Sequence, residues 1–109
     1  MRLVSAWIIH HKASMSEHSP MNLDGSEYIV GIVVVPASSM REALDVFDEY
    51  LSENEMQVMD IWKCEKYDPS NFKELTEESK EIRDVSIEVL ESGEAEFVTG
   101  ESSKVFEDK

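Results

Sequence analysis

Two apolar stretches within the first 40 positions predict two β-strands. Residues 3–11 are rich in Val, Trp and Ile without Gly or Pro, and residues 28–35 form an apolar run broken only by Gly31. Pro36 ends the second strand because it lacks the N–H group that a paired strand donates. The polar residues 12–27 between the strands contain the turn-forming pair Asp24-Gly25. They predict either strands that extend toward that turn or a long functional loop.

The next apolar positions recur at helical spacing and predict a helix over residues 40–52. Ser39 followed by Glu42 has the spacing of a capping box, in which the hydroxyl and the carboxylate satisfy backbone N–H groups of the first turn. The predicted buried face carries Met40, Ala43, Leu44, Phe47 and Leu51.

Residues 56–67 predict a third strand in which the alternation of apolar and polar positions is interrupted. Met56 and Val58 would lie on one face of an ideal strand, whereas Met59 and Ile61 would lie on the other. Either a β-bulge near Asp60 or burial of both faces would produce this pattern.

Residues 72–91 predict a second helix, because apolar and small residues recur every three or four positions and Gly93 follows as a C-cap. Asn71 with Glu74 is the candidate helix start. Residues 85–89 also alternate as a strand does, so a β-hairpin within residues 84–99 is the alternative. We favour the helix, followed by a strand over residues 95–99 and a tail over residues 100–109.

The element order β-β-α-β-α-β predicts a single α+β domain over residues 1–99. We expect a ferredoxin-like two-layer sandwich, a mostly antiparallel sheet with both helices on one face. The other face would be apolar, and a monomer rarely exposes such a face. A twofold homodimer through the sheet would cover it; the segment 12–27, the tail or a different partner are alternatives. The predicted interface residues are Trp7, Ile9, Ile32, Val34, Ile61 and Trp62.

Charge is distributed unevenly along the chain, whose formal net charge is −14. Residues 1–40 contain only 3 of its 24 acidic and 2 of its 10 basic residues. Residues 41–109 contain the other 21 acidic and 8 basic residues. Many of these acids repeat at i,i+4 spacing along the two predicted helices, where like charges repel. The alternatives are a solvated outer surface and a surface for a basic protein partner. The candidate partner-binding residues are Glu42, Asp45, Asp48, Glu49, Glu53, Glu77, Glu81, Asp84 and Glu88.

The chain contains three histidines, His10, His11 and His18, which form an alternative ligand site near the segment 12–27. Neighbouring strand residues point to opposite faces, so His10 and His11 are poorly placed to hold one ion. We therefore predict no metal site, no cofactor and no catalytic residue. Cys64 is the only cysteine, which indicates a reducing, cytoplasmic location.

Nucleic-acid and membrane partners are not expected. Phosphate binding needs clustered Lys and Arg, whereas the basic residues here are scattered among acids. The longest apolar segment, residues 28–37, is far shorter than the roughly 20 residues that span a bilayer.

Two functions remain as hypotheses. The first is a non-catalytic acidic module that docks on a basic protein; a small immunity or inhibitor protein that neutralises a nuclease toxin has this size and charge. The second is a small dimeric α+β enzyme or ligand-binding domain that uses the histidine region. We favour the first hypothesis.

Overall fold

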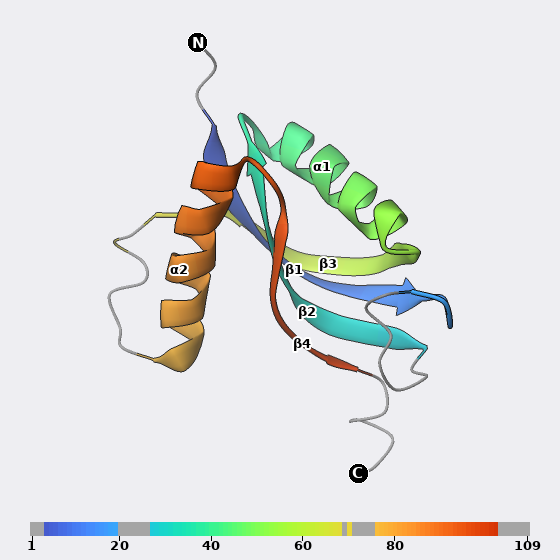
Figure 1. Cartoon of the computed structure of the whole chain (residues 1–109). Helices are drawn as coiled ribbons and strands as arrows, with labels where there is room; N and C mark the ends of the chain where they lie inside the picture. The colour runs from blue at the N-terminus through green and yellow to red at the C-terminus, as the bar shows by residue number, and fades with distance from the viewer. Residues whose placement is uncertain (1–3, 20–26, 69, 71–75, 103–109) are drawn as a thin grey trace.

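The structure is a computed structural model that describes residues 4–19, 27–68, 70 and 76–102 (Figure 1). Four strands form one sheet in the order β3-β1-β2-β4, and every neighbouring pair is antiparallel. The elements follow the predicted order β-β-α-β-α-β. Their bounds are β1 (Ser5–Met15), β2 (Tyr28–Ala37), α1 (Met40–Glu53), β3 (Met56–Lys66), α2 (Glu77–Ser92) and β4 (Glu96–Ser102).

The two helices lie on opposite faces of the sheet. One core cluster joins Ile9, Val33 and Val35 to the α1 residues Ala43, Phe47 and Leu51. A second cluster joins Ile8, Ile32 and Val34 to the α2 residues Ile82 and Val89. Successive side chains of a strand point to opposite faces, so consecutive β2 residues are buried alternately under α1 and α2.

The expectation of two helices on one face is therefore wrong, and the ferredoxin-like arrangement is not matched. The α+β class and the antiparallel four-stranded sheet are confirmed. The continuous apolar run in β2 did indicate burial on both faces. The chain buries the second face under its own second helix, which removes the observation that suggested a homodimer through the sheet.

The predicted ends of several elements agree with the structure. α2 ends at Gly93, which has the left-handed backbone (φ 75°) of a C-cap, so helix followed by strand is confirmed over residues 84–99. The hairpin alternative is wrong there. Strand β1 extends to Met15, whose N–H donates to the carbonyl of Glu27 at 2.9 Å, so β1 reaches into the segment 12–27, whereas β2 begins at Tyr28, just after it. The predicted turn at Asp24 and the predicted cap at Asn71 lie outside the described residues. The helix α2 itself begins at Glu77, later than predicted, with Thr76 as its N-cap.

The predicted N-cap at Ser39 is formed at the start of α1, but the reciprocal bond of the predicted capping box goes to Ser38, one residue before the cap. The Ser39 hydroxyl accepts the backbone N–H of Glu42 at 3.2 Å. The Glu42 carboxylate reaches back to Ser38, accepting its N–H at 3.3 Å and its hydroxyl at 3.1 Å.

Ser39→Ala is expected to lower the free energy of unfolding by about 1 kcal/mol, because it leaves a first-turn N–H without its acceptor. Ser39→Asn is the matched control, since its side-chain oxygen can replace the hydroxyl. Urea unfolding of both variants measures the effect. If Ser39→Ala and Ser39→Asn lowered the free energy of unfolding equally, the cap would not stabilise the helix.

The edge strand β3 carries two irregularities in its pairing with β1. The register shifts between Lys12 and Ala13 and again between His10 and His11, which leaves Met59 and Trp62 as the extra residues. The predicted bulge near Asp60 is thus confirmed. Bulges redirect side chains, and Met59 and Trp62 are 54% and 53% exposed.

Candidate functional site

A pocket of about 460 Å³ lies on the sheet face that carries α2. Its floor is formed by His10 of β1 and by parts of β2 and β4, and Trp62 of β3 stands at one end. Glu77, Glu78 and Glu81 from the start of α2 form a wall, and Glu101 of β4 contributes a fourth carboxylate. The remaining lining residues are Val30, Gly31, Ile32, Thr99 and Gly100.

Two glycines, Gly31 and Gly100, face each other across β2 and β4 at the floor of this pocket. A Cβ atom on Gly31 would lie 2.6 Å from the carbonyl oxygen of Thr99 and 3.0 Å from the Phe97 ring. A Cβ on Gly100 would lie 2.6 Å from the same ring. Such distances are shorter than van der Waals contact. The two glycines are therefore required for β2 and β4 to approach closely beneath the pocket.

The pocket is strongly acidic. Among the described residues that line it, four are glutamates and His10 is the one that can become cationic. Two lysines adjoin His10 but have partners of their own: the Lys12 ammonium lies 4.2 Å from the centre of the Tyr28 ring, and the Lys63 ammonium lies 3.4 Å from the Glu65 carboxylate. The N-terminus of α2 contributes about half a positive charge, far less than the four carboxylates carry.

His10 stays neutral at neutral pH. Burial lowers the pKa of its imidazole, and the nearby Lys63 lowers it further, while Glu65 and Glu78 act in the opposite direction. A neutral imidazole neither competes with a bound cation nor cancels a carboxylate. The pocket therefore keeps its negative charge at pH 7.

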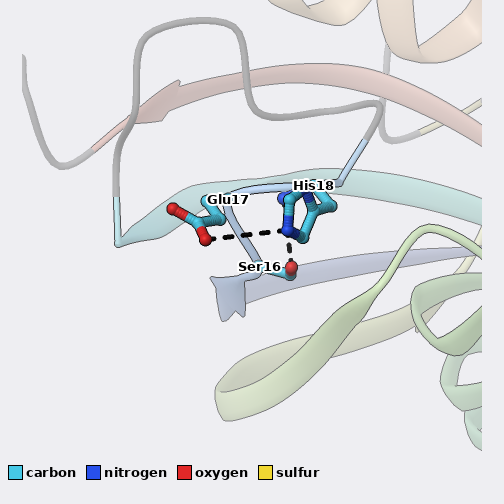
Figure 2. Close-up of polar contacts among 3 residues, drawn as sticks. All are labelled: Ser16, Glu17 and His18. Carbon is cyan, nitrogen blue, oxygen red and sulfur yellow. Dashed lines mark hydrogen bonds and ion pairs between the residues drawn. The ribbon is translucent and has the colours of Figure 1, made fainter.

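The three histidines do not form a common site. His10 lines the pocket, whereas His11 is fully buried on the opposite face, against Phe47 of α1. His18 lies after the end of β1, where its side chain is 79% exposed and its Nε2 lies 3.6 Å from Glu17 (Figure 2). Its backbone N–H donates to the Ser16 hydroxyl at 3.1 Å. The structure therefore does not bring the three histidines of the alternative ligand site together, and only His10 lines the pocket.

The nine predicted partner-binding acids are divided among several surfaces. Glu77 and Glu81 line the pocket. The α1 acids lie on the other side of the sheet, where Glu49 and Glu53 line a second hollow of about 420 Å³ with Tyr50 and Glu94. Glu42 belongs to the α1 cap. Glu78 and Glu101 were missed; Glu101 was assigned to the tail, but β4 extends to Ser102.

The six predicted interface residues do not share an open face. Trp7 and Ile9 lie on the α1 side, where the Trp7 indole donates to the Ala37 carbonyl at 3.0 Å. Ile61 also packs on that side, whereas Ile32 and Val34 are buried under α2. Only Trp62 remains largely exposed among the six, and it belongs to the pocket.

Groups suited to nucleophilic or metal chemistry are poorly placed. Burial raises the pKa of the half-buried Cys64 thiol, and Glu65 raises it further, so the protonated form is favoured. No group of three His, Cys, Asp or Glu side chains within the described residues is arranged to hold a metal ion. In the same part of the chain, no helix is long and apolar enough to cross a membrane.

One further carboxyl pair lies outside the pocket. Burial raises the pKa of Glu96 at the start of β4, and a hydrogen bond with Glu88 of α2 raises it further. Glu88, one of the predicted partner-binding acids, therefore lies near Glu96 and does not line the pocket. Of the nine predicted partner-binding acids, Glu77 and Glu81 line the pocket.

Comparison with known proteins identifies no relative: no protein-family model, no curated protein and no solved structure matches this chain significantly.

Proposed function

We propose that this protein is a non-catalytic binding module whose pocket receives a cationic segment of a protein partner. The observation that carries the proposal is the convergence of an exposed Trp62 and four carboxylates around one hollow. An aromatic ring beside carboxylates binds a cation through both charge and dispersion. The whole-chain charge of −14 would attract a basic partner from a distance.

An inhibitor of a basic enzyme is the most concrete form of this function. A nucleic-acid-cleaving enzyme presents clustered Lys and Arg to its substrate, and an acidic protein can occupy those side chains in place of phosphates. Electrostatic complementarity of this kind raises the rate of association and excludes acidic competitors. A homodimer is not part of this proposal, because α2 covers the apolar half of its sheet face.

The affinity must come from several contacts together. One exposed ion pair contributes about 0.2–1 kcal/mol, and about 1.4 kcal/mol corresponds to a tenfold change in affinity. A single bound cation would therefore dissociate readily. We expect an extended segment with two or more basic residues to be the smallest partner that binds well.

The test is calorimetric titration with a nona-arginine peptide at 150 mM salt (a chosen condition, at which the Debye length is about 8 Å). The double variant Glu78→Gln/Glu81→Gln should bind about tenfold more weakly than the wild type, because it removes two carboxylates from the pocket wall. The matched control is Asp45→Asn/Asp48→Asn, which removes the same charge from exposed positions on α1. It should change the affinity less than about twofold, since α1 lies across the sheet.

Equal losses in the two double variants would contradict the proposal, because binding would then depend on net charge and not on the pocket. Absence of measurable binding by the wild type would contradict it as well.

A further inference from the structure

The exposure of Trp62 is an unusual feature of the fold. Large aromatic side chains are normally buried for much of their surface. Trp62 is 53% exposed and belongs to neither core cluster. It is the extra residue of a β3 irregularity, and bulges of this type re-aim a side chain. The irregularity thus places an indole at the end of the pocket instead of in the core.

The carboxylates opposite Trp62 come from adjacent turns of one helix. Glu77 and Glu81 are four residues apart, and Glu78 and Glu81 are three apart, so each pair lies on one side of α2. Neighbouring side chains at this spacing have Cβ atoms about 5–6 Å apart. Two acceptor groups therefore stand side by side along the wall.

We infer that the preferred anchor of this pocket is an arginine side chain of the partner, stacked on Trp62 and hydrogen-bonded to the α2 carboxylates. This inference rests on the proposed function. A guanidinium is planar and weakly hydrated, and its five N–H donors spread over a fork that can reach two carboxylates at once. A lysine ammonium is a compact, strongly hydrated charge whose three N–H donors all belong to one nitrogen atom. It therefore matches the two neighbouring carboxylates less well.

A ring–cation contact of this kind already occurs elsewhere on the protein. The Lys12 ammonium lies 4.2 Å from the centre of the Tyr28 ring and does not line the pocket. The basic residues Lys80 and Arg83 of α2 do not line it either. Within the described part of the chain, no lysine or arginine lines the pocket, so a cation of the partner would be the first to enter it.

Three peptides of identical length and spacing separate this inference from the proposed function. Each carries three copies of one residue, arginine, lysine or the neutral isostere citrulline, between Gly and Ser spacers. We expect the arginine peptide to bind about fivefold more tightly than the lysine peptide, and the citrulline peptide to bind at least about tenfold more weakly than the arginine peptide. Calorimetry and the change in indole fluorescence measure all three.

Trp62→Ala should reduce the preference for arginine over lysine to less than about twofold while both peptides still bind through charge. Trp62→Phe is the conservative variant and should retain part of the preference. Thermal unfolding of both variants checks that the exposed substitution leaves the fold intact. Trp7→Phe, on the other face, is the matched aromatic control and should leave the preference unchanged.

Equal affinity of the wild type for arginine and lysine peptides would overturn the arginine assignment while the proposed function stands. An unchanged preference in Trp62→Ala would overturn the role of the indole. Failure of both cationic peptides to bind would overturn the proposed function itself.

Discussion

Phe47→Ala is expected to lower the free energy of unfolding by about 3–5 kcal/mol, the usual cost of removing a buried phenylalanine ring. Phe47 is fully buried at the centre of α1 and is one of three α1 residues in the core cluster, with Ala43 and Leu51. Its ring meets the His11 ring edge-on at a centroid distance of 4.8 Å and an angle of 67°. Truncation would leave a cavity between α1 and the sheet.

The position of α1 makes this loss difficult to compensate. α1 packs on β1, β2 and β3, and the described residues of α1 and α2 make no contact with each other. Figure 1 shows the two helices apart, each beside its own part of the sheet. The second helix therefore cannot hold α1 in place when its central side chain is removed.

Urea unfolding of the Phe47→Ala protein measures the loss. Met40→Ala is the matched control, because Met40 belongs to the same helix but is 48% exposed, and it should cost less than about 0.5 kcal/mol. Phe47→Leu should leave peptide binding unchanged, since the pocket lies on the other face. A loss below about 1 kcal/mol for Phe47→Ala would show that α1 is not packed as described.

The elements of this fold were largely predictable from local sequence patterns. Ser39 with Glu42 predicted a cap, Gly93 predicted the end of α2, and the interrupted alternation of residues 56–61 predicted a bulge. Each of these signals comes from residues a few positions apart. Local backbone geometry determines them, so no knowledge of the tertiary structure was needed.

The arrangement of the elements was not predictable in the same way. The apolar run of β2 indicated burial on both faces, but the run alone does not distinguish a second helix from a second subunit. The pocket was missed for a related reason: Trp62, His10 and Glu101 come from three strands whose order depends on long-range pairing. The spacing of acidic residues along the predicted helix did indicate Glu77 and Glu81 as binding residues. The contribution of Glu101 required knowing that β4 continues past Thr99.

His11 is the least expected residue of the core. It is fully buried, its Nδ1 lies 3.2 Å from the Ile9 carbonyl oxygen, and its Nε2 has no hydrogen-bond partner among the described residues. A neutral ring whose Nδ1–H donates to Ile9 satisfies this geometry. Protonation of Nε2 would place a second N–H without an acceptor in an apolar core, which is costly.

The protein is therefore expected to lose stability in mild acid through His11. Burial lowers the pKa of its imidazole in the folded state, His10 lowers it further, and the bond to Ile9 opposes both. An unfolded histidine titrates near pH 6.5, so the unfolded chain binds more protons as the pH falls below that value. This contribution to stability is complete above the unfolded pKa and is lost as the pH falls toward the folded pKa. Between pH 7 and 5 the loss is at most about 2 kcal/mol, the value for a ring that stays neutral while folded.

Comparison with His11→Leu isolates this effect from the opposing background. Acidification also relieves the repulsion between acidic residues in a chain of charge −14. In addition, the pKa of Glu96 is raised in the folded state, so the folded protein binds this proton at a higher pH than the unfolded chain does. Both contributions stabilise the protein as the pH falls. The leucine variant retains them but lacks the imidazole. Its stability relative to the wild type, from urea unfolding at pH 7 and pH 5, should therefore rise with acidification. His18→Gln, which changes an exposed ring, should show no such rise. A constant difference between His11→Leu and the wild type would mean that the buried ring takes up its proton as easily as a free histidine.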